Sequence, residues 1–383
     1  MGYGLGLIYL QDSSGKNTKS MREKKKKQKT GKRNSAVVSG ILQKFLNTYK
    51  RNCAQSLCTT SPKLRQDLRR CIEKGAILTK LIVARPEVSE DDSLPVSLKP
   101  LLMTIREERY MHGKELCVWD VPLTNQDIAE LAIIIELHGR TSYPFSKVEL
   151  MDCGIDAWSV ERFGKAVNFS VLICIVLDYN EIAIDGLRGL CHGLEGNTRL
   201  LTLSMCYCNL GPASGPLLGN LVTKTAIRDV FLDGNDLQCE GASKLIEPIA
   251  QQAGTEAQSK VNKGKRSRKE LPEVASWVSK LHLADNGIDG RGKDGNIAPM
   301  QFTQMVCQLI RFSNHLTELD LDDNCLGELC GKELLNALKE RKEAKMPSLK
   351  IKVTAQMNAD TFSKIVKCNR KLKKVKKKKK RKK

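Results

Sequence analysis

The residues most able to do chemistry lie in one glycine-rich segment, GIDGRGKDGN, at positions 287–296. Gly290, Gly292 and Gly295 match the GxGxxG spacing of dinucleotide-binding turns, and the segment also matches GxxxxGK, the spacing of phosphate-binding loops. The backbone amides of such loops hold phosphate groups. However, Asp294 stands where a phosphate-binding loop needs a Ser or Thr for Mg²⁺.

The same segment partly matches a calcium-binding loop, because Asp285 and Asp289 have a spacing that oxygen ligands use. That loop also needs an oxygen ligand at its third position and a glutamate at its twelfth, where this chain has Gly287 and Asn296. We therefore interpret the segment as a Gly/Asp turn and predict no bound cofactor or metal ion.

The cysteines and histidines form no catalytic constellation. Cys206 and Cys208 make a CxC pair, but a zinc site needs four donors and no second pair lies nearby. The five histidines are scattered, and none belongs to an HExxH motif or a nucleophile elbow. The fourteen cysteines are typical of free thiols in a reducing compartment. We predict no catalytic residue and no enzymatic activity.

These residues are carried by repeating elements, which are clearest in three consecutive units. Alternating apolar residues around Ile175, Leu203 and Val230 change to spacings of three and four within one period, which predicts a strand followed by a helix. Asn180 and Asn235 follow two of these strands, where a short amide side chain can bond the turning backbone. A fixed period of this length predicts a stacked array.

The pattern resembles the leucine-rich-repeat family, and its unit of 27–28 residues with a full helix is similar to the ribonuclease-inhibitor type. The resemblance implies an α/β solenoid, a right-handed horseshoe with parallel strands on the concave face and helices on the convex face. It also implies a protein-interaction surface. We expect about nine strands, with their middle residues at positions 81, 116, 148, 175, 203, 230, 281, 319 and 351.

The chain divides into an array and flanking segments. The steps from 230 to 281 and from 281 to 319 exceed one period, and we assign the excess to solvated loops in the connections. No run of 18 apolar residues predicts a membrane span. Translation from Met1 or Met21 stays open. The predicted segments are a disordered basic 1–34, a helical cap 35–80, an array 81–363 with insertions at 251–274 and 287–296, and a disordered polybasic tail 364–383.

The net charge of +21 is unevenly distributed. Residues 16–33, 260–269 and 364–383 together hold 30 of the 64 basic residues and one acidic residue. Acidic residues therefore outnumber basic ones in the rest of the chain. The basicity belongs to the flanks and one insertion rather than to the surface of the array.

Strand alternation predicts which side chains face the concave side, because the neighbours of each buried middle residue point the other way. In the C-terminal half these are mainly acidic, with one aromatic residue among them. They form either a solvated acidic face or a docking surface for a basic partner, and they could also attract the chain's own tail. The predicted partner-binding residues are Asp229, Phe231, Asp233, His282, Glu318, Asp320 and Asp322.

The polybasic tail is the second candidate site, because eleven of its last thirteen residues are basic. Such a segment acts as a nuclear import signal or is attracted to anionic membrane, acidic protein tails or nucleic acid. Any nucleic-acid contact should be nonspecific and steeply salt-dependent. The predicted tether to an anionic partner consists of Lys376, Lys377, Lys378, Lys379, Lys380 and Arg381.

The function predicted from these features is a non-enzymatic scaffold that holds a protein partner on its concave face and is tethered by its polybasic segments. One alternative is a GTPase regulator similar to the Ran GTPase-activating proteins, although their C-terminus is acidic and this one is basic. A second is a nuclear or nucleolar RNA-associated protein. The expected location is cytoplasmic or nuclear, with cytoskeletal or ciliary sites as further options.

Overall fold

Nine parallel strands form one sheet in the computed structural model, which describes residues 14–86, 94–136, 143–262, 278–292 and 294–368. Within these residues, the order of strands in the sheet is their order in the chain. The predicted middle residues lie side by side, from Leu81 beside Leu116 at one end to Leu319 beside Ile351 at the other. One strand per repeat, in constant register, confirms the predicted α/β solenoid.

The strands contain three to five residues each, just enough to bury a middle side chain. They are β1 (Lys80–Ala84), β2 (Glu115–Trp119), β3 (Lys147–Met151), β4 (Cys174–Val176), β5 (Thr202–Ser204), β6 (Asp229–Phe231), β7 (Lys280–His282), β8 (Glu318–Leu321) and β9 (Lys350–Val353).

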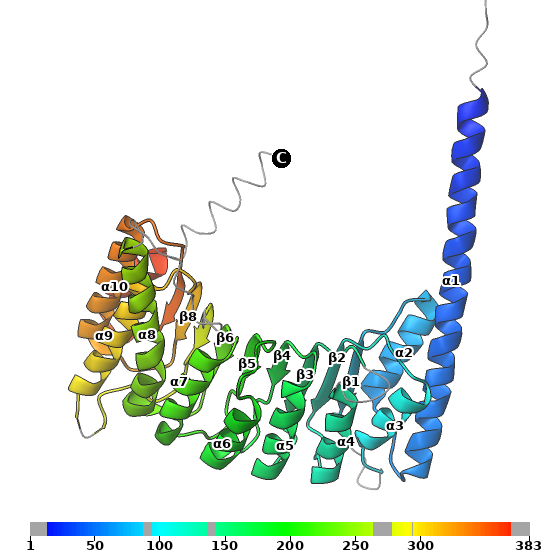
Figure 1. Ribbon diagram of the computed structural model, residues 1–383, viewed down its shortest axis with the longest axis horizontal. Coiled ribbons are helices and arrows are strands. Elements are labelled where there is room, and N and C mark those ends of the chain that lie inside the picture. The colour runs from blue at the N-terminus through cyan, green and yellow to red at the C-terminus, as the bar shows by residue number, and fades with distance from the viewer. Residues whose placement is uncertain (1–13, 87–93, 137–142, 263–277, 293, 369–383) are drawn as a thin grey trace, which may run out of the picture.

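The helices line the outer side of the curved sheet, so the strands face the concave side (Figure 1). Each helix packs on its neighbours in the array, as α5 does on α6 and α8 on α9. The helices are α1 (Ser14–Gln55), α2 (Pro62–Lys74), α3 (Lys99–Glu107), α4 (Asn125–Ile135), α5 (Ala157–Asn168), α6 (Ala183–Gly193), α7 (Gly215–Lys224), α8 (Gln238–Asn262), α9 (Ile297–Phe312) and α10 (Gly327–Glu343), with a short 3-10 turn η1 (Pro212–Ser214).

Buried asparagines join consecutive repeats where each chain turns off its strand. Asn235 is fully buried; its amide nitrogen donates to the carbonyl of Met205 in the preceding repeat at 2.7 Å and to that of Leu232 in its own repeat at 2.9 Å. Its amide oxygen accepts the backbone N–H of Cys208 at 2.9 Å. Asn180, Asn286 and Asn324 are buried and bonded in the same way.

Cysteine replaces asparagine at this position in two repeats. The thiol of Cys208 donates to the carbonyl of Leu177 at 3.2 Å, and that of Cys153 donates to the carbonyl of Val118 at 3.5 Å. Both thiols are buried, and burial raises their pKa to about 12. Cys208 is therefore a hydrogen-bonding repeat residue, rather than only the small apolar filler that its position in the sequence indicates.

The C-terminal half of α1 covers the open end of the array, where it packs on α2 and α3. Leu42, Phe45 and Tyr49 are buried, and the Tyr49 hydroxyl accepts the backbone N–H of Ser61 at 3.1 Å. Figure 1 shows that the N-terminal part of α1 continues away from the array. These contacts give the first strand the apolar cover that a solenoid end requires.

Two segments predicted to be disordered or looped are partly helical. Helix α1 begins at Ser14, so the prediction of disorder for 1–34 is wrong over residues 14–34. Lysine, arginine, glutamine and glutamate favour helix, and extending a docked helix avoids the cost of nucleation. For the same reason α8 continues to Asn262, into the predicted loop 251–274. Residues 263–274 lie outside the described residues.

The C-terminal end of the array is also helical, over residues 359–368. Ile365 is fully buried, and Thr361 donates to the carboxylate of Glu328 on α10 at 3.0 Å. The predicted start of a disordered tail at 364 is therefore too early, because the apolar residues of this segment pack against α10.

We predict that Asn235→Ala destabilises the array by about 3 kcal/mol, because it leaves buried backbone groups of two repeats without partners. Asn235→Cys is the matched control, since cysteine occupies this position in two repeats and its thiol can still bond a carbonyl. It should cost clearly less. Urea unfolding followed by circular dichroism measures both, and equal losses would contradict the assigned role of the amide.

Candidate functional site

The seven residues predicted to bind a partner lie together, on β6, β7, β8 and the turns that follow β6 and β8. The register aligns Asp229 with Lys280 and Glu318, and aligns Phe231 with His282 and Asp320. The structure therefore brings together residues that are up to 93 positions apart in the sequence.

The acidic residues of this face are largely neutralised by the chain's own lysines. The Lys280 ammonium bonds the Asp229 carboxylate at 2.8 Å. On the last strand, Lys350 bonds Glu318 and Lys352 bonds Asp320. Each pair joins neighbouring strands. The predicted acidic docking face is thus mostly a set of internal ion pairs, which the alternation of one strand alone does not show.

Phe231 is not the exposed aromatic anchor that the sequence predicts. Its ring contacts the His282 ring edge-on, with centroids 4.6 Å apart, and it is partly buried. The His282 side chain is itself 14% exposed, and its ring nitrogens lie 3.6–3.9 Å from carboxylate oxygens of Asp233, Glu318 and Asp320. Aromatic and acidic side chains of this face therefore contact one another.

Two carboxylates, one just after β4 and one just after β6, are partly buried, which disfavours their charged form. Burial raises the pKa of Asp178, although its carboxylate accepts the Ser204 hydroxyl at 2.7 Å and the Cys206 N–H at 2.9 Å. Burial also raises the pKa of Asp233, whose carboxylate accepts the Ala284 N–H at 2.8 Å. Both act as acceptors that join one turn to the next.

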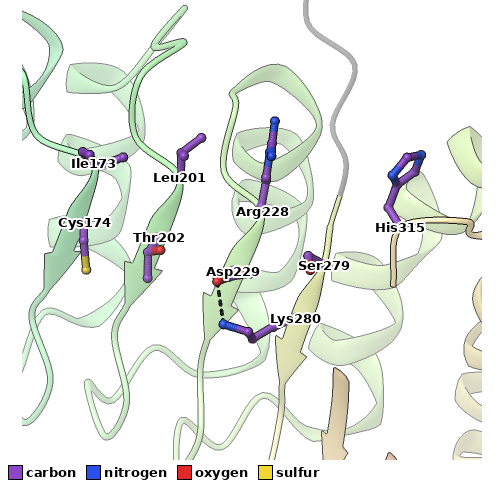
Figure 2. Close-up of a pocket in the computed structure, with 9 residues that line it drawn as sticks. All are labelled: Ile173, Cys174, Leu201, Thr202, Arg228, Asp229, Ser279, Lys280 and His315. Atoms are coloured by element: carbon purple, nitrogen blue, oxygen red, sulfur yellow. Dashed lines mark hydrogen bonds and ion pairs between the residues drawn. The ribbon is translucent and has the colours of Figure 1, made fainter. Parts of the chain in front are cut away.

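A groove of about 630 Å³ lies beside the first residues of β4 to β7 (Figure 2). It is lined by side chains of several repeats, among them Arg228, the Asp229–Lys280 pair and His315. The carboxylate and ammonium groups in it already bond each other, as Figure 2 shows. Its lining also includes apolar side chains such as Ile173 and Leu201.

The glycine-rich segment 287–296 forms turns before α9. The Asp289 carboxylate accepts the backbone N–H of Arg291 at 2.8 Å and lies 3.4 Å from its guanidinium, so the chain itself uses this carboxylate. Among the described residues, no group of three or more His, Cys, Asp or Glu side chains could hold a metal ion. None of the described helices is long and apolar enough to cross a membrane. The predicted tether, Lys376 to Arg381, lies outside the described residues.

None of the predicted partner-binding residues is an aromatic residue of the turns at the edge of the sheet where the strands end. Two exposed tyrosines, Tyr179 and Tyr207, stack there with ring centroids 5.1 Å apart. The signal was available, because an aromatic residue occupies the fourth position after the middle strand residue in two successive repeats. Most other repeats have Asp or Gly there.

We predict that Lys352→Ala destabilises the protein by about 2 kcal/mol, because the Asp320 carboxylate is buried and would lose its cation. Lys350→Ala is the matched control and should cost less than about 1 kcal/mol, since Glu318 is more exposed. Adding Asp320→Asn to Lys352→Ala should restore part of the loss in urea unfolding. No recovery would contradict the pairing.

We predict that Asp178→Asn weakens the pH dependence of stability. With a raised pKa in the folded state, Asp178 loses its proton first in the unfolded chain, so wild-type stability falls as pH rises above the ordinary value of 3.8. Asparagine keeps a carbonyl acceptor without this effect. The melting temperature of the variant relative to wild type should therefore be higher at pH 7 than at about pH 4. The reverse trend would exclude burial as the cause.

Comparison with known proteins supports the repeat type. No family model matches the chain. Over 233 residues, 58% of this chain, it is 26% identical to a ribonuclease inhibitor of Mus musculus, and it spans 44% of that protein's length. A chain in the crystal structure of the Rad7 and Elc1 complex in yeast is similar with a TM-score of 0.40 and 12% identity, over 93% of this chain and 85% of that one. With nine parallel strands in register and asparagines that join the repeats, this chain has the fold of a leucine-rich-repeat solenoid, and its repeats are similar to those of the ribonuclease inhibitor.

Proposed function

We propose that the protein is a non-enzymatic scaffold whose repeat array binds a basic protein segment, and whose polybasic segments tether it to an anionic partner. The observation that carries the first part is the charge along one edge of the array. The first six residues after each of strands β2 to β8 together contain ten acidic residues and no lysine or arginine: Asp120, Asp152, Asp156, Asp178, Glu181, Asp233, Asp236, Asp285, Asp322 and Asp323. The longer connection after β7 continues with two further acidic residues and two basic ones, Asp289, Arg291, Lys293 and Asp294.

Most of this charge is available, unlike that of the strands. Among the described residues, Asp120 is the one member of the set in ion-pair contact with a lysine or arginine, Arg85 at 3.6 Å. Glu181, Asp236 and Asp285 are exposed. Because parallel strands end at the same edge, these carboxylates form a negative surface beside the concave face, interrupted at the turn after β5, which has no acidic residue. Such a surface favours encounter with a basic segment.

The proposal of a scaffold rather than an enzyme is supported by the distribution of reactive groups. The concave carboxylates are paired with lysines, and the buried cysteines have raised pKa values that keep the thiols protonated and unreactive. The chain therefore offers a surface of many weak contacts instead of one reactive centre.

The second part of the proposal rests on the sequence of the tail. Its lysines can attract acidic protein tails or nucleic acid without sequence preference. We also propose a cytoplasmic or nuclear location, since all fourteen cysteines are free thiols and such usage is typical of reducing compartments.

The test is affinity capture from cell extract with two full-length variants and wild type. In the first, Lys376 to Lys380 and Arg381 become Gln; in the second, Asp152, Asp236 and Asp285 become Asn. The first variant should keep the partners of the array, lose nucleic acid or acidic partners and change its location in cells. The second should lose the array's basic partners and keep the tail's.

Two outcomes would contradict the proposal. The same captured proteins in both variants would show that neither charged surface selects partners. Capture of a GTPase whose GTP hydrolysis accelerates with added protein would favour a GTPase regulator instead.

A further inference from the structure

In each of seven successive turns, the residue four positions after the middle residue of the strand has a left-handed backbone. These residues lie in one row, because the N–H of each of the first six bonds a carbonyl in the next repeat, as that of Tyr179 does with Cys206 and that of Tyr207 with Asp233. Their φ angles lie between 50° and 69°. The row consists of Asp120, Asp152, Tyr179, Tyr207, Gly234, Asp285 and Asp323.

Glycine and aspartate are suited to this row, and tyrosine is not. A left-handed backbone is uncommon for any residue with a side chain, and a bulky residue in that region is a true outlier. Tyr179 and Tyr207 accept this strain in two successive repeats at φ angles of 61° and 54°. Strain of this kind concentrates at functional sites.

The two strained tyrosines are not part of the buried core. The exposed fractions of Tyr179 and Tyr207 are 52% and 44%. Their rings are stacked almost parallel, with an angle of 3° between them. The Tyr207 ring lies over Gly234, since a Cβ atom on that glycine would lie 2.2 Å from ring carbons. Three repeats thus combine to hold a flat aromatic platform in solvent.

Carboxylates surround the platform on both sides. Asp152 precedes Tyr179 by one repeat in the row, and Asp285 follows Gly234 by one repeat; both aspartates are exposed. Burial first, and then the charges of Asp285 and Asp233, raise the pKa of Tyr207. This negative surrounding repels phosphate, so the exposed rings are unsuited to stacking nucleic-acid bases.

One aspartate of the row already contacts an arginine of this chain. The Arg85 guanidinium lies 3.6 Å from the carboxylate of Asp120, two repeats before Tyr179. Adjacent strands are about 4.8 Å apart, so a cation on the outer face of Tyr179 would also lie within reach of Asp152. Arginine fits this geometry better than lysine, because its planar guanidinium both stacks on an aromatic ring and bonds a carboxylate.

We propose that Tyr179 and Tyr207, with Asp152 and Asp285, form a recognition site for an arginine side chain in an extended basic segment of a partner protein. The inference rests on the proposed function, which supplies the basic partner, and adds the residue type that the array selects. The acidic edge attracts the segment, and the tyrosine platform distinguishes arginine from lysine.

The test uses full-length protein and two fluorescein-labelled peptides, (Gly-Arg)6 and (Gly-Lys)6, in fluorescence anisotropy at one salt concentration. Wild type should bind the arginine peptide several-fold more tightly. Tyr179→Asn with Tyr207→Asn should weaken arginine binding about tenfold, the loss expected for a cation–aromatic contact. It should also remove the preference over lysine. Its melting temperature should stay unchanged or rise, because asparagine tolerates the left-handed backbone.

The matched control is Tyr179→Phe with Tyr207→Phe, which keeps the stack and should retain the preference. Asp152→Asn should weaken both peptides, with a larger effect on arginine. Equal binding of both peptides by wild type and the asparagine variant would overturn the arginine site and leave the acidic scaffold standing. Failure of wild type to bind either peptide would overturn both proposals.

Discussion

The hydrogen bonds of the buried asparagines that follow four of the strands are the constraint on which this structure depends. A strand of three residues cannot satisfy the backbone of the turn that follows it, and an unpaired buried carbonyl or N–H is costly. Asn180, Asn235, Asn286 and Asn324 fill this need by bonding groups of their own repeat and of its neighbour. Where cysteine takes the position, at 153 and 208, its thiol donates to a carbonyl of the preceding repeat and its backbone N–H donates to the asparagine of the next repeat. Fixing each turn on the next sets a constant register for the whole sheet.

The constant register decides the chemistry of the concave face. Side chains at equivalent positions stand one strand apart, so opposite charges on neighbouring strands pair, as in Lys80 with Glu115 and Asp229 with Lys280. At the end of the sheet, Lys350 and Lys352 pair with the preceding strand and place lysines on the exposed edge. Charge on an edge strand opposes pairing with another sheet. The lysines of β9 therefore neutralise Glu318 and Asp320 on the preceding strand and also oppose the pairing of this edge with another sheet.

The same register places the turn residues in a row that has more freedom. The backbone there is fixed as left-handed, but the side chains point into solvent and pack little. Aspartate and glycine satisfy the backbone requirement at most positions, and this makes the edge acidic. Tyr179 and Tyr207 depart from that rule, and Gly234 provides the space in which the second ring lies. Departures from local preference without compensating burial are expected at functional sites, and this one motivates the proposed arginine site.

Local periodicity was enough to predict the repeat, the nine strand centres and the alternation of their side chains, because the same pattern recurs along the chain. Which charged side chains form ion pairs with one another depends on contacts between repeats, and local periodicity does not show it. The partners of Glu318 and Asp320 lie 32 positions away on the next strand, and the contact of Phe231 with His282 crosses a long insertion. The extent of α1 and α8 was likewise decided by docking, since charged residues favour either solvated coil or helix until one end is packed. The local sequence pattern determines the fold of each repeat, and contacts between repeats determine which side chains remain unpaired at the surface.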